Sequence, residues 1–186
     1  MKIKLYLFTA IAMILNSFNL QAQSGAKKVL VVYYSYSGNT RIIAEQIQKG
    51  TGGDIFEIQP AQSYPKDYQE LTDQAKKEIG ENYKPALKTK VKNIEKYDVI
   101  FVGSPCWWAT IAPPVATFLS SYDLSGKTII PFMTHEGSRM GNTENDIKKL
   151  CPESNILHGF PVRGSRVKQA HDEVMKWLKE IKMVNQ

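Results

Sequence analysis

The sequence contains little cysteine, with only Cys106 and Cys151 among its 186 residues. Two thiols are too few for the disulfide framework of a small secreted scaffold. The sequence also lacks low-complexity tracts, and 42% of its residues are hydrophobic, which together argue against intrinsic disorder. This length and composition predict one globular domain with a complete hydrophobic core.

A long apolar run is also absent, so no segment is expected to span a bilayer. The N-terminus instead has the three-part order of a secretory signal peptide, basic at Met1–Lys4 and apolar at Leu5–Leu15. A polar stretch follows and leads to Ala22, which with Leu20 occupies the two positions that signal peptidase reads. The pattern therefore predicts cleavage after Ala22.

Cleavage at this site predicts a protein exported to the periplasm or the extracellular space. No cysteine directly follows the apolar run and no twin-arginine pair is present, so we expect neither a lipid anchor nor export in the folded state. No stable membrane insertion is expected after cleavage. The expected organisation is a signal peptide at 1–22, a short linker at 23–27 and one domain at 28–184.

Acidic residues are fewer than basic ones in the predicted mature chain. Loss of Lys2 and Lys4 leaves 22 basic and 18 acidic residues, a net charge of +4. Much of the excess lies in one hydrophilic stretch, at Lys84, Lys88, Lys90, Lys92 and Lys96. Such a stretch is typical of a solvated loop, and it could also dock an acidic partner. Because no nucleic-acid-binding motif accompanies it, we expect no nucleic-acid partner.

Five β-branched and aromatic runs alternate with helical patterns along the predicted domain. The predicted strands are Lys28–Tyr34, Asp54–Ile58, Val99–Gly103, Thr128–Phe132 and a weaker Asn155–Phe160. The first and third runs are almost continuously apolar, as the central strands of a parallel sheet are. The alternation predicts an α/β fold, a three-layer doubly wound sandwich around a five-stranded parallel sheet. Ligands bind such sheets beyond the carboxyl ends of the strands.

The helical patterns carry apolar residues at three- and four-residue steps. Asn142 and Thr143 are candidate caps for the fourth helix, and the Pro113-Pro114 pair suits the first turn of the third. The predicted helices cover residues 42–47, 68–79, 113–119, 142–150 and 167–181.

The loop after the first predicted strand, residues 35–40 (SYSGNT), is rich in hydroxyls and contains no lysine. Backbone N–H groups at the start of a helix attract anions, and Gly38 allows the backbone to approach one closely. The missing lysine excludes a Walker triphosphate loop, and the absence of GxGxxG disfavours a dinucleotide. The loop therefore favours a terminal monophosphate, while a hydroxyl-rich turn with a helix N-cap remains the other interpretation.

Two further polar loops are expected at the same edge of the sheet. The first, residues 103–110 (GSPCWWAT), contains adjacent tryptophans, one expected to cover the core and the other free to stack on a planar ligand. Pro105 would stiffen this loop, and Cys106, which has no basic neighbour, resembles a bystander more than a nucleophile. The second, residues 134–141 (THEGSRMG), offers hydroxyls and backbone donors. Its single histidine, His135, is more typical of a structural residue than of a catalyst.

The SYSGNT loop resembles the phosphate loop of flavodoxins, whose pattern is T/S-x-T/S-G-x-T. The segments GSPCWW (103–108) and THEGS (134–138) resemble the two loops that flank the isoalloxazine ring. The resemblance runs from about Lys27 to the last predicted helix and includes the segment YPKDY at 64–68. It implies the flavodoxin-like strand order 2-1-3-4-5 and, because no insertion lies near the fifth strand, the short-chain type.

The resemblance implies FMN as the cofactor. Ser35, Ser37, Asn39 and Thr40 would bind its phosphate, Pro105, Trp107 and Trp108 would line the ring, and residues 134–138 would contact the ring's polar edge. The complete set of implied cofactor-binding residues is Ser35, Tyr36, Ser37, Gly38, Asn39, Thr40, Pro105, Cys106, Trp107, Trp108, Thr134, His135, Glu136, Gly137 and Ser138. Because the flavin would carry the redox chemistry, no catalytic side chain and no metal site are expected.

The chain departs from the family's pattern in two respects. Flavodoxins that carry electrons are commonly acidic, whereas the mature chain is positive. The third loop has Glu136 and Arg139 where related loops are often rich in glycine. Glu136 would affect the flavin's reduction potential if its carboxylate pointed towards the ring.

The leading interpretation is an exported FMN-binding electron-transfer protein, whose partner is a redox protein or a small-molecule electron acceptor. One alternative is a small FMN-dependent reductase of quinones that uses NAD(P)H, although a source of NAD(P)H outside the cytosol is doubtful. An alternative of another class is a non-catalytic module that binds a different phosphate ligand. A hydrolase is disfavoured because the sequence has no GxSxG motif, and a phosphatase because it has no Cys-x5-Arg motif.

Overall fold

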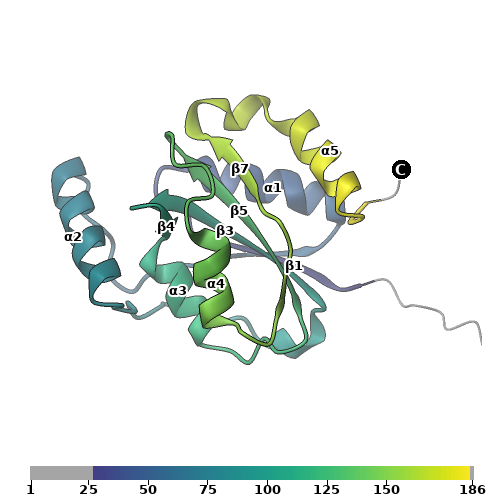
Figure 1. Ribbon diagram of the computed structural model, residues 1–186, viewed down its shortest axis with the longest axis horizontal. Coiled ribbons are helices and arrows are strands. Elements are labelled where there is room, and N and C mark those ends of the chain that lie inside the picture. Colours follow the sequence, from purple (N-terminus) through teal and green to yellow (C-terminus); the bar gives the residue numbers. More distant parts are fainter. Residues whose placement is uncertain (1–26, 185–186) are drawn as a thin grey trace, which may run out of the picture.

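The computed structural model describes residues 27–184, so the predicted signal peptide at 1–22 lies outside the described residues. The parallel strands follow the order β2-β1-β3-β5-β6, with β7 also paired to β5 and the short β4 antiparallel to β3 (Figure 1). Their bounds are β1 Val29–Tyr33, β2 Asp54–Glu57, β3 Val99–Trp107, β4 Thr110–Ile111, β5 Thr128–His135, β6 Asn155–Ile156 and β7 Phe160–Arg163. The predicted fold and strand order are therefore confirmed, with β6 and β7 as two pieces of the fifth strand.

The helices cover both faces of this sheet. Helices α1 and α5 lie on one face and α3 and α4 on the other, while α2 stands at the left end of the molecule in Figure 1. The bounds are α1 Asn39–Thr51, α2 Tyr68–Gly80, α3 Pro113–Ser120, α4 Thr143–Leu150 and α5 His171–Glu180, with 3-10 turns η1 Ile94–Lys96 and η2 Gly164–Gln169. Within the described residues, no helix combines the length and apolarity needed to cross a bilayer.

Successive residues of the central strands enter two separate cores. Val31 and Phe101 pack with α1 and α5, whereas Leu30 and Ile100 pack with α3 and α4. All four side chains are essentially buried, because alternate residues of a strand point to opposite faces and both faces are covered. The nearly continuous apolar runs of β1 and β3 follow from this arrangement.

Strands β3 and β5 are longer than the sequence predicted. The predicted strand Val99–Gly103 continues to Trp107, and the predicted strand Thr128–Phe132 continues to His135. The continuation is stabilised by pairing between distant segments, because Pro105 lies beside Thr134 in the parallel ladder and Cys106 beside Ile111 in the antiparallel one. Residues 104–107 and 134–135 are therefore strand rather than loop.

The fifth predicted strand, Asn155–Phe160, is wrong as a continuous element. Its first residues form β6 and pair with β5 up to Ile129, and the pairing resumes where Phe132 lies beside Phe160. Three residues separate β6 from β7 where β5 has two, so the edge strand carries a bulge. Pro131, which lacks an N–H group, lies on β5 at this interruption.

Asn142 occupies the N-cap position of α4, as predicted, but its side chain makes no capping hydrogen bond. Its backbone N–H donates to Ala109 O at 2.7 Å, which fixes α4 to the β3–β4 hairpin. The stretch expected to begin the last helix at Val167 is the 3-10 turn η2, and α5 begins only at His171.

Candidate functional site

The three predicted loops meet at the carboxyl ends of β1, β3 and β5. Thr134 joins them, because it lies beside Pro105 in the sheet and its Oγ1 is 2.9 Å from Thr40 Oγ1. Both threonines are buried, with exposed fractions of 1% for Thr40 and 5% for Thr134. A buried hydroxyl pair of this kind fixes the start of α1 against the end of β5.

The start of α1 exposes backbone donors within the first loop. The N–H of Ile42 donates to Gly38 O, and that of Arg41 donates to Ser35 Oγ at 3.2 Å. Within residues 27–184, the N–H groups of Asn39 and Thr40 have no acceptor, as is usual for the first turn of a helix. Two amides and the positive end of the helix dipole therefore converge where an anion would lie.

Gly38 shapes this cradle. Its φ of 90° lies in the left-handed region, which other residues adopt only under strain, and a Cβ placed there would have no atom within 4 Å apart from those of its chain neighbours. Space therefore lies beside the backbone at the helix start. The free amides, the open space and the absence of an acidic residue in the first turn fit a phosphate group.

Trp107 forms an aromatic wall with three tyrosines. Its ring is edge-on to Tyr64, Tyr34 and Tyr36, with centroid distances of 4.9, 5.7 and 6.0 Å respectively. Tyr34 and Tyr64 are buried, whereas Tyr36 is 38% exposed. We call Tyr34, Tyr36, Tyr64 and Trp107 the aromatic wall; it lies between the first loop and the start of α2.

Two hydrogen bonds hold the rings of the aromatic wall. Tyr36 OH donates to Pro65 O at 2.6 Å, and Tyr64 OH donates to the buried Glu78 carboxylate at 2.5 Å. Burial, followed by this hydrogen bond to Glu78, raises the pKa of Tyr64 above its ordinary value. The tyrosine is therefore a neutral donor to an α2 carboxylate, and Gln74 supplies a second donor to Glu78 at 2.7 Å.

Trp108 lies apart from the aromatic wall and against α2. It is 52% exposed, its Nε1 donates to Thr72 O at 3.0 Å, and Lys76 Nζ lies 5.0 Å from the ring centroid. Trp108 and Ala109 form the tip of the β3–β4 hairpin with φ values of 49° and 62°. Asn and Gly are the residues favoured at such positions, so this turn is strained. Of the two adjacent tryptophans, Trp107 is the one that covers the core edge.

Residues 135–138 lie beside the first loop and β7. His135 Nδ1 is buried and has no hydrogen-bond partner within the described chain, and burial lowers the pKa of this imidazole, helped by the charge of Arg139. The Glu136 carboxylate lies 3.8 Å from Arg163 Nε. Gly164 lies close to both segments, because a Cβ there would meet the ends of the Glu136 and Asn39 side chains, which would have to move aside.

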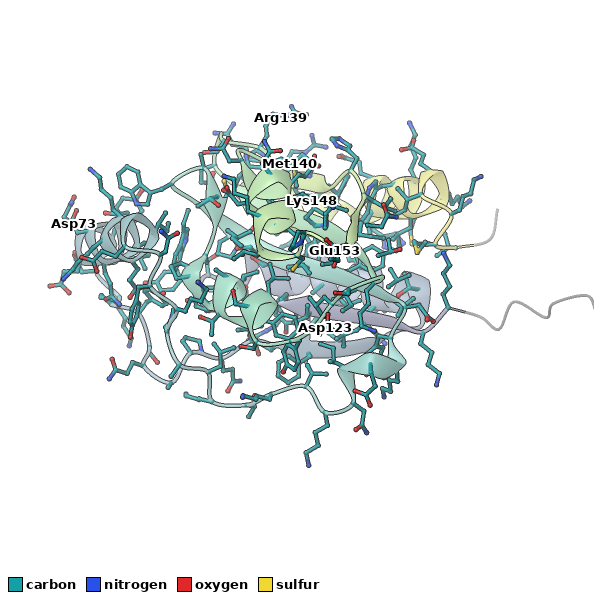
Figure 2. All side chains as sticks on the ribbon, turned by 60° about the horizontal axis from the view of Figure 1, so that its bottom comes forward. Asp73, Asp123, Arg139, Met140, Lys148 and Glu153 are labelled. Atoms are coloured by element: carbon teal, nitrogen blue, oxygen red, sulfur yellow. The ribbon has the colours of Figure 1, made fainter. Side chains whose placement is uncertain are left out.

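Cys106 connects the second and third loops but is a poor nucleophile. Burial raises the pKa of its thiol, and a hydrogen bond with Ser138 offsets part of that effect. The thiolate is therefore disfavoured at neutral pH. Arg139, beyond this contact, lies at the outer surface near the top of Figure 2.

The sequence reasoning missed three residues of this region: Tyr34, Tyr64 and Glu78. Tyr34 ends the first predicted strand, Tyr64 begins the YPKDY segment and Glu78 falls in the helix predicted at 68–79, but none of the three was given a role at the site. The only signal in the sequence was the recurrence of tyrosine near these loops. The contacts among the three residues and Trp107 form only in the tertiary fold. By contrast, the predicted residues at 35–40, 105–107 and 134–138 are brought together as expected.

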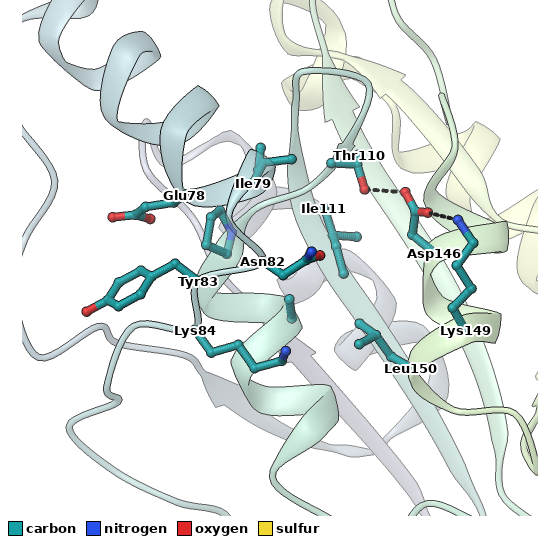
Figure 3. A pocket seen from close by; sticks show the side chains of 12 residues that line it. Glu78, Ile79, Asn82, Tyr83, Lys84, Thr110, Ile111, Asp146, Lys149 and Leu150 are labelled. Carbon is teal, nitrogen blue, oxygen red and sulfur yellow. Dashed lines mark hydrogen bonds and ion pairs between the residues drawn. The ribbon is translucent and has the colours of Figure 1, made fainter.

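A separate cavity of about 250 Å³ lies between α2, β4, α3 and α4 (Figure 3). Ile111 and Leu150 contribute apolar surface, and Asp146 accepts hydrogen bonds from Thr110 Oγ1 at 2.6 Å and Lys149 Nζ at 3.0 Å. None of the predicted cofactor-binding residues lines it. This cavity is therefore distinct from the three-loop site.

Comparison with known proteins agrees with this geometry. A family model described as flavodoxin matches residues 28–181. A candidate flavoprotein from Bacteroides eggerthii is 33% identical, with 84% of this chain and 98% of that chain covered and a TM-score of 0.71. A second, from Bacteroides uniformis, is 31% identical over 83% of this chain and 99% of that chain, with a TM-score of 0.74.

A third similar structure is a flavoprotein in complex with FMN from Lactobacillus acidophilus. It is 25% identical, with 77% of this chain and 98% of that chain covered and a TM-score of 0.64. No curated protein sequence matches the chain. The resemblance found in the sequence is confirmed, and FMN is the cofactor to which it points. The chain belongs to the flavodoxin family.

Proposed function

We propose that this protein binds FMN at the three-loop site and transfers electrons through it outside the cytosol. The observation that carries the proposal is the pair of free amides, Asn39 and Thr40, at the dipole end of α1 beside the open backbone of Gly38. Bound FMN would supply reversible redox chemistry. The chain's own residues would bind it, orient it and set its electrostatic surroundings.

The phosphate would be held by dipoles rather than by cationic side chains. The Asn39 and Thr40 amides would donate to it, and so would the hydroxyl of Ser37. Ser35 Oγ accepts from Arg41 N–H, which leaves the Ser35 O–H free to donate as well. The neighbouring Arg41 guanidinium is engaged with Glu57 at 2.5 Å, so it contributes no unpaired cation to the cradle.

The remaining loops would surround the flavin ring. Trp107 and Pro105 would contribute apolar surface, and residues 134–138 would contribute polar groups. His135 would be neutral at pH 7, because its pKa lies below the ordinary value of 6.5. Arg163 offsets the charge of Glu136, so this carboxylate would disfavour electron uptake less than an unpaired one.

Export and partner choice belong to the same proposal. The signal peptide predicted at 1–22 would deliver the chain to the periplasm or the extracellular space, where FMN would be acquired after folding. The partner would be a redox protein or a small electron acceptor. A net charge of +4 on the mature chain favours an acidic partner over a basic one.

The test compares FMN with riboflavin, which lacks the phosphate. The starting material is the protein recovered after export, whose N-terminus is expected at Gln23, and binding is measured by quenching of flavin fluorescence. Ser37→Asp places a carboxylate in a cradle without a cation. We expect FMN affinity to fall at least about 100-fold, equivalent to about 2.7 kcal/mol, and riboflavin affinity to change less than about threefold.

Ser37→Asn is the matched control, because it adds similar bulk without charge. It should retain most of the preference for FMN. Equal losses of FMN and riboflavin in Ser37→Asp would refute the phosphate assignment. Absence of quenching by either flavin in the unmodified protein would refute the redox function.

A further inference from the structure

A second cavity, of about 520 Å³, opens on the β2 side of the aromatic wall. Glu57 and Ile58 line it at the end of β2, and Tyr34 and Ser35 line it just after β1. Its position beyond the carboxyl ends of two parallel strands is typical of ligand sites in α/β sheets. Its volume is within the range of small-molecule sites, and no residue of the 134–138 loop lines it.

The aromatic part of the cavity is held in place before any ligand arrives. Tyr34, Tyr36 and Tyr64 line it, and Trp107 packs behind all three rings. The hydroxyls of Tyr36 and Tyr64 already donate to Pro65 O and to Glu78. Tyr34 and Tyr64 are buried and Tyr36 is 38% exposed, so Tyr36 supplies most of the accessible ring surface. A ring fixed in this way loses little conformational entropy on binding and suits a planar aromatic body.

The charged part of the cavity is positive. Lys66 and Lys88 line it, and neither ammonium forms an ion pair within residues 27–184. Glu57, the acidic residue in the lining, is neutralised by its ion pair with Arg41. The lining therefore attracts an anion.

A short ribbon fixes the backbone that carries Lys88. Ala61 N–H donates to Ala86 O at 2.7 Å, Lys88 N–H donates to Gln59 O at 2.8 Å, and Pro60 forms a bridge with Leu87. Gln59 and Pro60 also line the cavity. Lys88 thus lies on a hydrogen-bonded backbone segment at the edge of the cavity rather than on a free loop.

We propose that this cavity binds a planar aromatic anion, a carboxylate or sulfonate, separately from FMN. The aromatic body lies against Tyr36, beside the buried Tyr34 and Tyr64, and the anionic group lies near Lys66 and Lys88. The ligand contacts the aromatic wall at its tyrosines, whereas Trp107 and Pro105, which we assign to the flavin ring, do not line the cavity. The cavity shares Ser35 and Tyr36 with the first loop, so the two sites are neighbours. Binding at the cavity does not require FMN, and it can be measured with or without flavin.

The probe is 2-naphthoate, titrated calorimetrically into the purified exported protein. 2-Naphthylmethanol, of similar shape and without charge, and acetate, without a ring, are the comparison ligands. We expect 2-naphthoate to bind most tightly and acetate not to bind at the same concentrations. Lys66→Gln/Lys88→Gln should weaken 2-naphthoate roughly tenfold and 2-naphthylmethanol less than about twofold.

The matched control is Lys90→Gln/Lys92→Gln, which removes the same charge from two residues that follow Lys88 in the sequence and do not line the cavity. It should leave 2-naphthoate affinity within about twofold. An equal loss in both double variants, or no binding of 2-naphthoate to the unmodified protein, would overturn the proposal. Displacement of 2-naphthoate by FMN would also overturn it, whereas failure of FMN to bind would affect only the function proposed above.

Discussion

The first loop and the aromatic wall are neighbours, but they are built in different ways. Residues 35–40 present backbone amides that a helix start leaves free, and their side chains add hydroxyls. The aromatic wall presents side chains from the residue after β1, from the first loop, from the approach to α2 and from the end of β3. The first loop is thus formed by residues adjacent in sequence, whereas the aromatic wall is formed by residues that only the tertiary fold brings together.

This difference separates the two parts of the site by their sensitivity to substitution. A cradle made of amides depends on backbone conformation and tolerates many side-chain changes outside Gly38. A wall made of interlocking rings depends on each ring and on the hydrogen bonds that orient it. Variants of the wall should therefore lower folding stability as well as flavin binding, whereas charge changes in the cradle should act mainly on phosphate.

The largest expected effect on stability separates the two tryptophans. Trp107→Ala removes a ring that contacts three tyrosines and should lower the free energy of unfolding by about 2–4 kcal/mol. Trp108→Ala removes an exposed hydrogen bond and a cation–π contact and should lower it by less than about 1 kcal/mol. Urea denaturation measures both, and equal losses would mean that Trp107 is not part of a packed wall.

A smaller effect is expected from the hydroxyl that orients Tyr64. Tyr64→Phe leaves the buried Glu78 with Gln74 as its remaining side-chain donor and should cost about 1–3 kcal/mol of unfolding free energy. Tyr68→Phe is the control, since Tyr68 is 77% exposed, and it should change stability by less than about 0.5 kcal/mol. If both variants unfold at the same urea concentration, Glu78 does not hold the wall.

The smallest effect concerns His135, at the edge of the cradle. Its folded pKa lies below 6.5, mainly because of burial, so the unfolded chain takes up a proton first as the pH falls. Stability is therefore lost as the pH decreases from about 6.5 towards the folded pKa, and no further loss from this group follows below it. His135→Gln should show a smaller drop in Tm between pH 7.5 and pH 5 than the unmodified protein; a parallel drop would contradict the burial.

The fold was predictable because its signals are local. Buried parallel strands such as Leu30–Tyr33 require continuous apolar runs, and Gly38 followed by Asn39 and Thr40 marks a turn into a helix at the sheet edge. These signals suffice for the strands, the helices and the cradle, whereas the strand order followed from the resemblance to flavodoxins. Each of these signals depends only on residues that are adjacent in the sequence.

The aromatic wall and the ends of β3 and β5 were not predictable, because they depend on contacts between residues far apart in sequence. Ser104–Trp107 reads as a loop, since it contains serine and proline, but pairing with β4 and with Met133 and Thr134 of β5 makes it a strand. The contact between Tyr64 and Trp107 joins residues that are far apart in sequence. Likewise, the break before Phe160 depends on a bulge opposite Pro131, which becomes apparent only when both strands are aligned.

The central claim is that backbone amides at the start of α1 hold the phosphate of FMN, and amide chemical shifts test it most directly. In ¹⁵N-labelled protein titrated with FMN and, separately, with riboflavin, the Asn39 and Thr40 amide protons should move strongly downfield with FMN alone, because a phosphate oxygen would become their acceptor. Amides near Trp107 should shift with both flavins. Equal shifts of Asn39 and Thr40 with riboflavin, or none with saturating FMN, would contradict the claim.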